Sequence, residues 1–125
     1  MIFGIGIDLV EIARIERLLD RWGDRFLKRV FTQAEIEFCQ GKVHSASRFA
    51  LRFAAKEAFS KALGSGFRKG LNFPHIEVVR GPDGPPRLML HRRAEELCQS
   101  YGIKNSFLSL ADDGGYAVAV VVLEA

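Results

Sequence analysis

The sequence lacks most of the features that mark secreted, zinc-binding and membrane proteins. Its 125 residues include only two cysteines, Cys39 and Cys98, with no CxxC pair and no histidine at ligand spacing. A disulfide framework and a zinc site are therefore not predicted. No apolar run approaches the roughly 20 residues of a membrane-spanning helix, and no basic region precedes the short apolar stretch at the amino terminus. We expect a cytoplasmic protein with free thiols and no membrane partner.

Aromatic residues other than phenylalanine are also scarce. One tryptophan and two tyrosines stand against ten phenylalanines, a composition that favours a phenylalanine-packed core. A protein that stacks nucleic-acid bases on a sheet needs aromatic side chains at alternating strand positions, and the last two predicted strands offer only Phe107 and Tyr116. We therefore do not expect nucleic acid as a partner. The length and the 48% share of hydrophobic residues predict one globular domain over residues 1–125.

Acidic residues are nearly absent from one stretch of the chain. Between Lys42 and Lys69 there are seven lysines and arginines, and Glu57 is the only acid. The formal net charge of the whole chain is only +3, so the basic excess is local. A local basic block predicts an anionic ligand.

Hydrophobic periodicity and turn signals predict the order β-α-α-α-β-β-α-β-β. A capping box at Thr32–Glu35 opens the second helix, and Ser45 or Ser47 is expected to cap the third. Trp22 is expected on the inner side of the first helix, and the wholly apolar last strand at the centre of the sheet. The order predicts an α+β domain with one antiparallel sheet carrying helices on one side. The predicted elements are 2–7, about 10–22, 32–40, 48–66 including a glycine-rich turn at its end, 75–80, 86–90, 91–101, 104–111 and 116–123.

Two isolated carboxylates carry most of the chemical information. Asp8 follows the first strand, and Glu57 lies on a small apolar face of the long helix. A carboxylate is costly to desolvate there unless it is paired or bound to a metal. One interpretation is an ion pair between Glu57 and Lys61, one helical turn later. The other is a Mg²⁺ site, because Mg²⁺ takes one or two protein carboxylates and completes its shell with phosphate oxygens and water.

The basic block around these carboxylates favours phosphate ligands and phosphoryl transfer. The Gly64–Gly66 turn permits close backbone approach, but it lies at the negative end of its helix and is not a phosphate loop of the P-loop kind. The alternative is a non-catalytic module that binds an anionic nucleotide or a nucleic acid. Such a module needs the basic block but neither Asp8 nor Glu57, so the substitution Glu57→Gln discriminates between the two hypotheses.

Two motifs resemble those of the holo-[acyl-carrier-protein] synthase family, the small bacterial 4′-phosphopantetheinyl transferases. The first is GIGIDLVEIARI, from Gly4 to Ile15, and the second is RFAAKEAFSKALGSG, from Arg52 to Gly66. The turn Asp83–Pro86 and the closing hairpin from Ser109 to Val122 also match. The resemblance spans essentially the whole chain and implies the 4′-phosphopantetheinyl transferase fold.

The resemblance also implies a transfer reaction that supports fatty acid biosynthesis. The phosphopantetheine arm of coenzyme A moves to a serine of apo acyl carrier protein, and adenosine 3′,5′-bisphosphate leaves. By position, Asp8 and Glu57 are implied to bind Mg²⁺ together with the coenzyme A pyrophosphate. Glu57 is implied to take the serine proton, directly or through a water, and Lys61 to stabilise charge on the β-phosphate or to protonate the leaving group. The implied contacts to coenzyme A are Arg52, Ser60, Lys61, Gly64, Gly66, Gly84 and Pro86.

The first helix and its surroundings carry the prediction of a protein partner. Arginines recur there at helical spacing with acids between them, a pattern that by itself is typical of a solvated face. The resemblance implies instead that an acidic helix of acyl carrier protein docks on Arg14, Arg21, Arg25 and Arg29. It also implies a homotrimer with active sites between subunits. One departure is Asp112, where many family members have a histidine; an acid there repels phosphate unless it turns away.

Overall fold

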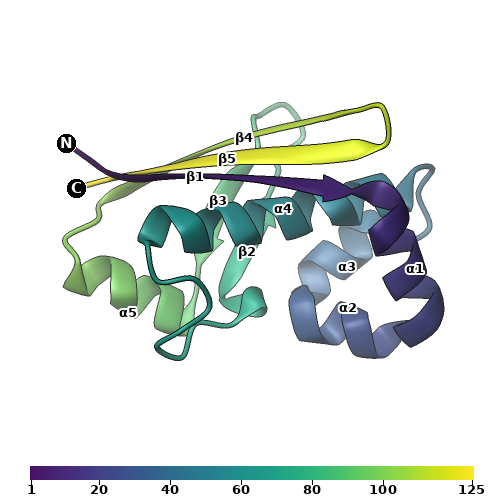
Figure 1. The fold of residues 1–125 in the computed structure, drawn as a ribbon, viewed down its shortest axis with the longest axis horizontal. Coiled ribbons are helices and arrows are strands. Elements are labelled where there is room, and N and C mark those ends of the chain that lie inside the picture. The colour runs from purple at the N-terminus through teal and green to yellow at the C-terminus, as the bar shows by residue number, and fades with distance from the viewer.

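A computed structural model describes all residues from 1 to 125 (Figure 1). The strands pair antiparallel, and helices pack on one side of the main sheet, so the predicted α+β class is confirmed. The elements in chain order are β1 (Ile2–Glu11), α1 (Ile12–Trp22), α2 (Asp24–Val30), α3 (Gln33–Cys39), α4 (Ser45–Leu63), η1 (Phe73–His75), β2 (Ile76–Val79), β3 (Arg87–Leu90), α5 (Arg92–Ser100), β4 (Asn105–Asp113) and β5 (Tyr116–Glu124).

The strands form two hydrogen-bonded sheets, whereas a single sheet was expected. The main sheet has the order β1-β5-β4, with β5 in the centre as its apolar sequence predicts. β2 and β3 form a separate two-stranded sheet. Each of these two strands is four residues long, and the proline-containing turn 81–86 between them lacks the backbone donors that would extend the ladder. The hairpin therefore stays short, and β3 lies near β4 of the main sheet without pairing with it.

The main sheet packs on α4 through glycine and alanine. A Cβ atom on Gly4 would lie 2.0 Å from the carbonyl oxygen of Ala62, and one on Gly6 would lie 1.8 Å from that of Ala58. Only a residue without a Cβ permits this approach of strand to helix. Because side chains alternate along a strand, Asp8 is the next residue of β1 that faces α4. β1 runs along α4 (Figure 1), so the close packing holds the Asp8 carboxylate against this helix.

Three boundaries differ from the expected ones. β1 continues to Glu11, which pairs with Tyr116, because the strand follows β5 to its end; α1 therefore begins only at Ile12. Gly23, with a φ of 51°, ends α1 and allows the unpredicted helix α2 to begin. His44 takes the N-cap position of α4 in a left-handed conformation without a side-chain cap, so the expected serine cap is wrong.

Two other local predictions had opposite outcomes. The capping box at α3 is confirmed, because Thr32 Oγ1 accepts a hydrogen bond from Glu35 N at 3.2 Å and Glu35 Oε1 accepts one from Thr32 N at 2.9 Å. The inward orientation of Trp22 is wrong, since this side chain is 44% exposed. The guanidinium groups of Arg21 and Arg25 lie 5.0 and 5.6 Å from its ring centroid, so two arginines pack near the ring at the surface.

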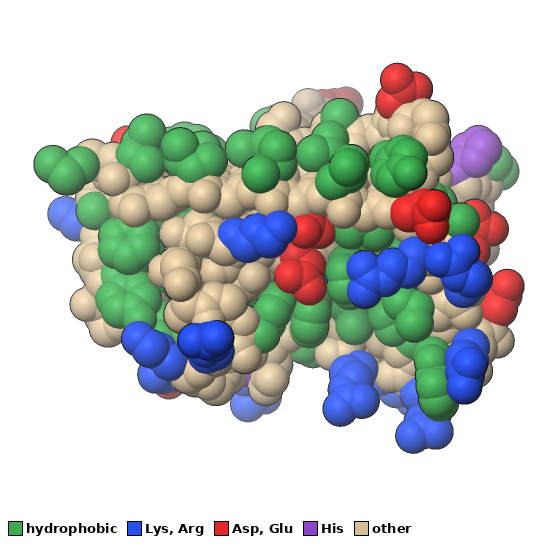
Figure 2. Space-filling view, viewed as in Figure 1, with side chains coloured by type: hydrophobic (Ala, Val, Ile, Leu, Met, Phe, Trp, Pro, Cys, Tyr) green, Lys and Arg blue, Asp and Glu red, His purple; other side chains and the backbone are tan.

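The face of the main sheet opposite α4 is apolar and exposed in the single chain. On β1, Ile5, Ile7 and Leu9 are 61%, 58% and 64% exposed. Hydrophobic side chains line up along this sheet in Figure 2. No helix combines the length and the apolar character that crossing a bilayer would require.

Candidate functional site

Asp8, Glu57 and Lys61 meet where β1 passes along α4. Lys61 Nζ donates hydrogen bonds to Asp8 Oδ1 at 3.0 Å and to the carbonyl oxygen of Ile7 at 3.1 Å. The ion pair of Lys61 is therefore with Asp8, and the pair with Glu57 that helical spacing suggested is not formed. Figure 2 shows acidic side chains beside a basic one near the centre of this face.

The Glu57 carboxylate has no ion-pair partner in the chain. Burial raises the pKa of Glu57 and the nearby Asp8 raises it further, whereas Lys61 and Arg14 act in the opposite direction. Two carboxylates held near each other in a partly desolvated place repel when both are ionised. The arrangement therefore favours a cation that both carboxylates can contact.

The donor set fits Mg²⁺. Asp8 and Glu57 supply hard carboxylate oxygens, and two protein carboxylates are sufficient for this ion when phosphates and water complete its shell. No cluster of three or more histidine, cysteine, aspartate or glutamate side chains is positioned to hold a metal by itself. A metal ion at this pair would thus depend on a phosphate ligand for much of its coordination.

The carboxyl-terminal end of α4 presents backbone but not the Ser60 hydroxyl. Ser60 is 2% exposed, and its hydroxyl donates to the carbonyl oxygen of Glu57 at 2.7 Å. This position gives the expected contact of Ser60 with coenzyme A no support. Gly64 and Gly66 have φ angles of 92° and 62°, which glycine adopts without strain. The turn after α4 therefore has the open backbone that the sequence predicts.

A second site, which is basic and separate from the carboxylate site, surrounds the ring of Phe38. The Arg52 guanidinium lies 4.6 Å from the ring centroid, and Arg48 and Lys42 approach it at 5.8 and 4.5 Å. Arg52 is 5% exposed, and burial lowers its pKa. The Nε atoms of Arg48 and Arg52 are buried without a hydrogen-bond partner. Buried cationic donors without partners are a favourable place for an anion.

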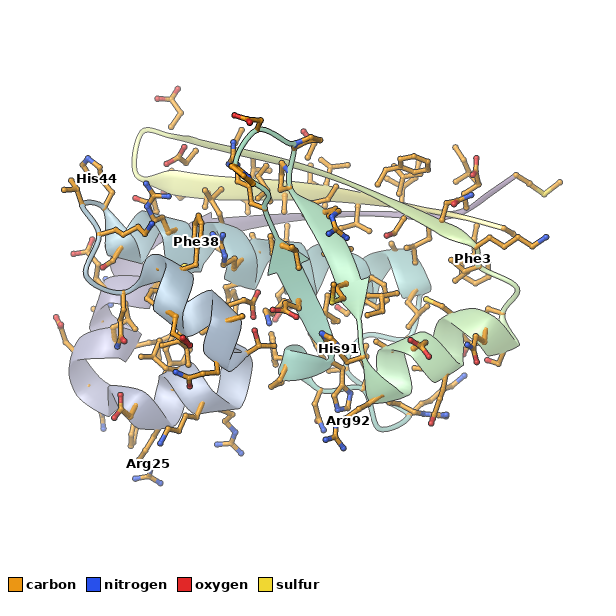
Figure 3. The ribbon with its side chains drawn as sticks, turned by 180° about the vertical axis from the view of Figure 1, so that it is seen from behind. Phe3, Arg25, Phe38, His44, His91 and Arg92 are labelled. Atoms are coloured by element: carbon orange, nitrogen blue, oxygen red, sulfur yellow. The ribbon has the colours of Figure 1, made fainter.

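The residues expected to bind coenzyme A fall into two groups. Arg52 and Glu57 are about 140° apart around α4, so their side chains leave the helix in different directions. β1 passes on one side of α4, and the β2–β3 hairpin lies on the other (Figures 1 and 3). The turn of that hairpin contains Gly84 and Pro86. One chain therefore does not bring Arg52, Gly84 and Pro86 to the Asp8–Glu57 site.

The four arginines expected to dock a carrier protein are all exposed, but they are not equivalent. The Arg14 guanidinium lies 5.6 Å from the ring centroid of Phe53 and lowers the pKa of Glu57, so Arg14 belongs to the edge of the carboxylate site. Further along α1 and α2, a cavity of about 310 Å³ is lined by Leu18, Trp22, Arg25, Phe26 and Arg29.

The apolar part of this cavity was missed in the sequence. Leu18, Trp22 and Phe26 follow one another at intervals of four residues. This spacing indicates that the three side chains lie on the same side of the helical segment. Gly23 separates the two helices and interrupts the periodicity. An apolar surface rimmed by arginines suits an amphipathic acidic helix.

Lys56, the residue before Glu57, lies in a fully buried environment in which its charge is paired. Its ammonium donates to Glu35 Oε1 at 2.7 Å and to the carbonyl oxygen of Phe73 at 3.1 Å. The other oxygen, Glu35 Oε2, accepts from Val78 N at 2.9 Å. Both side chains are fully buried. This pair joins α3, α4 and β2, and its satisfied hydrogen bonds assign it to the fold.

Comparison with known proteins identifies the family. A family model described as the 4′-phosphopantetheinyl transferase superfamily matches residues 4–121. The chain belongs to this superfamily. The curated holo-[acyl-carrier-protein] synthase of Geobacter sp. (strain M21) is 54% identical over 124 residues, which covers 99% of both chains.

Solved structures of transferases of this superfamily share the fold over the full length. Holo-[acyl-carrier-protein] synthase from Neisseria meningitidis matches with a TM-score of 0.92 and 34% identity, covering 100% of each chain. The enzyme from Helicobacter pylori in complex with coenzyme A matches with a TM-score of 0.85 and 39% identity, covering 96% of this chain and 99% of that one. The expected 4′-phosphopantetheinyl transferase fold is confirmed.

Proposed function

We propose that this protein is a Mg²⁺-dependent holo-[acyl-carrier-protein] synthase that acts in the cytoplasm and serves fatty acid biosynthesis. It transfers the 4′-phosphopantetheine of coenzyme A to a serine of apo acyl carrier protein and releases adenosine 3′,5′-bisphosphate. The convergence of Asp8, Glu57 and Lys61 between β1 and α4 carries the proposal. Full-length relatives with this name support it.

The reaction exchanges one phosphorus–oxygen bond for another. The serine oxygen forms a bond to the β-phosphorus of coenzyme A, and the bond from that phosphorus to the bridging oxygen of the pyrophosphate breaks. The serine proton leaves the nucleophile, and the bisphosphate departs with the bridging oxygen. Mg²⁺, when bound by Asp8 and Glu57, supplies charge neutralisation for the pyrophosphate.

Two side chains perform the remaining chemistry. Glu57 accepts the serine proton, directly or through a water. Lys61 Nζ stabilises negative charge on the transferred phosphate or protonates the leaving oxygen. The Gly64–Gly66 turn offers backbone to the pantetheine arm.

The second basic site binds the nucleotide end of coenzyme A in this proposal. The unpartnered Nε atoms of Arg48 and Arg52 are suited to phosphate oxygens, and the turn with Gly84 and Pro86 lies beside the adenine. Asp112 is exposed at the end of β4, so it can turn away from a phosphate.

Two half-sites on different sides of α4 and an exposed apolar sheet support a homotrimer with active sites between subunits. A second copy brings its hairpin and Arg52 to the Asp8–Glu57 site of the first, and contact between sheets covers Ile5, Ile7 and Leu9. Sedimentation equilibrium tests this point, and Ile7→Glu, which places a charge in the contact, is expected to yield monomers. A wild-type protein that stays monomeric at micromolar concentration contradicts it.

Carrier protein docks on Arg14, Arg21, Arg25 and Arg29 by charge complementarity. Such contacts act mainly on the association rate and on its salt dependence. The cavity beside Trp22 accommodates an apolar side chain of the docked helix.

Intact mass spectrometry of apo acyl carrier protein after incubation with the protein, coenzyme A and Mg²⁺ tests the reaction. We expect a gain of one phosphopantetheine that EDTA and Asp8→Ala each abolish, while Glu95→Ala, which changes an exposed acid on α5, leaves it unchanged. Coenzyme A binding without any transfer, under conditions where an authentic synthase modifies the same carrier, contradicts the proposal.

A further inference from the structure

Lys61 holds one of the two oxygens through which Asp8 could bind a metal ion. Its ammonium lies 3.0 Å from Asp8 Oδ1 and also binds the Ile7 carbonyl oxygen at 3.1 Å. The Asp8 side chain is only 14% exposed, whereas that of Lys61 is 53% exposed. The carboxylate is thus fixed in place by β1, and the ammonium covers it from the solvent side.

The charges around the pair make the contact a competition. Glu57 and Asp8 contribute two negative charges, and Arg14 from α1 and Lys61 from α4 face them. A divalent cation on the two carboxylates would lie beside the ammonium, and like charges at such separations repel strongly away from bulk water. The ammonium and the metal ion therefore cannot share Asp8 Oδ1 without loss of affinity.

We propose that Lys61 is the resident counter-ion of Asp8 and that it leaves this carboxylate for an anionic oxygen of the substrate pyrophosphate when a divalent cation binds. The inference rests on the proposed function, because the pyrophosphate of coenzyme A is the anion that receives the ammonium. By linkage, whatever favours one binding event through a shared switch favours the other equally. Lys61 thus weakens metal binding to the free protein and strengthens the coupling between metal and coenzyme A.

The surroundings of Lys61 permit this exchange. The side chain has four flexible methylene groups and a compact, strongly hydrated ammonium, and more than half of it is open to solvent. Lys61 lies in the last turn of α4, next to the Gly64–Gly66 turn that is proposed to receive the substrate. A rotation of the side chain alone is enough to free the ammonium from Asp8 for an oxygen of the bound pyrophosphate.

Mn²⁺ binding measured by the electron paramagnetic resonance of the free ion tests the exchange without reference to activity. Replacing Lys61 by methionine is expected to tighten Mn²⁺ binding to the otherwise ligand-free protein by about three- to tenfold. Lys104→Met, a matched loss of one charge near the far end of the sheet, is expected to leave the affinity within about twofold. Circular dichroism and thermal unfolding show whether each variant is folded.

The variant Arg14→Met distinguishes direct competition for the Asp8 oxygen from the electrostatic effect of any nearby positive charge. Arg14 faces Glu57 but makes no ion pair with Asp8, so its removal should change Mn²⁺ affinity less than the removal of Lys61. Equal tightening by both variants overturns the inference, since it shows a field effect without competition for one oxygen. Unchanged or weaker Mn²⁺ binding by Lys61→Met also overturns it.

Coenzyme A provides the second arm of the test. The factor by which saturating coenzyme A tightens Mn²⁺ binding, corrected for Mn²⁺ held by coenzyme A alone, is expected to be smaller in Lys61→Met than in the wild type. An equal factor contradicts the exchange. Failure of the proposed function gives a different result: Mn²⁺ binding is then insensitive to Asp8→Asn and Glu57→Gln.

Discussion

Two consecutive residues of α4 belong to carboxylate–lysine arrangements of opposite character. Lys56 and Glu35 form a fully buried pair at 2.7 Å, and backbone groups of Val78, Thr32 and Phe73 complete its hydrogen bonds. Glu57, one residue later, lies near Asp8 without an ion pair of its own, and burial raises its pKa. The first arrangement is satisfied and closed; the second is unsatisfied and open to a ligand.

The difference shows how a helix separates structure from chemistry. Adjacent residues leave a helix about 100° apart, so Lys56 reaches α3 and η1 while Glu57 faces the side where β1 passes. A buried charge is tolerated when every donor and acceptor is paired. A charge left partly unpaired at a functional site lowers stability and gains affinity for a ligand.

The largest effect is expected from breaking the buried pair. Lys56→Met leaves the Glu35 carboxylate buried without its cation, and the loss of one partner of such a pair lowers the free energy of unfolding by about 3–5 kcal/mol. Denaturant unfolding measures this loss, with Lys104→Met as an exposed control. Adding Glu35→Gln to Lys56→Met removes the uncompensated charge and should restore part of the stability. An unchanged midpoint in the single variant means that the pair is not structural.

Breaking the open arrangement is expected to affect turnover instead of folding. Glu57→Gln removes a metal ligand and the candidate base, and we expect the rate of phosphopantetheine transfer to fall about 10²- to 10³-fold. The control Glu95→Gln changes an exposed glutamate on α5 and should keep the wild-type rate. Full activity of Glu57→Gln would assign the proton transfer and the metal elsewhere.

A smaller effect is expected from separating β1 and α4. Gly6→Ala places a Cβ 1.8 Å from the carbonyl oxygen of Ala58, so the strand must shift, and overpacking of this kind costs about 1–3 kcal/mol. Activity should fall with stability, because Asp8 moves with the strand. Gly81→Ala, where nothing lies within 4 Å of the new Cβ, is the matched control. Equal melting temperatures for both variants would show that the close approach is dispensable.

The smallest expected effect is a pH-dependent change in melting temperature when Glu57 is replaced by glutamine. The pKa of Glu57 is raised by burial and by Asp8, so its contribution to stability is present below its unfolded pKa and is lost as pH rises through the folded value. In EDTA at pH 7, Glu57→Gln should therefore melt about 2 °C above the wild type. The difference should disappear below about pH 4. A lower melting temperature at pH 7 would mean that Glu57 stabilises the fold.

Most of the architecture could be predicted from local sequence. The apolar strand Tyr116–Glu124 is central, the capping box opens α3 at Gln33, and α4 ends at Gly64 as expected. Helix α2 and the extension of β1 to Glu11 could not be predicted, because Gly23 breaks the periodicity and strand pairing decides where β1 ends.

The sequence by itself determined the family, the basic block and the two isolated carboxylates, because residue types and motif spacing are properties of the chain. Only the tertiary structure decided the partners. It paired Lys61 with Asp8, which lies 53 residues away in the sequence, and not with Glu57 one helical turn away. It also buried Lys56 against Glu35. It also placed β1 along one side of α4 and the end of β2 beside Arg52. Helical spacing limits which residues can meet, but the close approach of β1 at Gly4 and Gly6 selects which ones do.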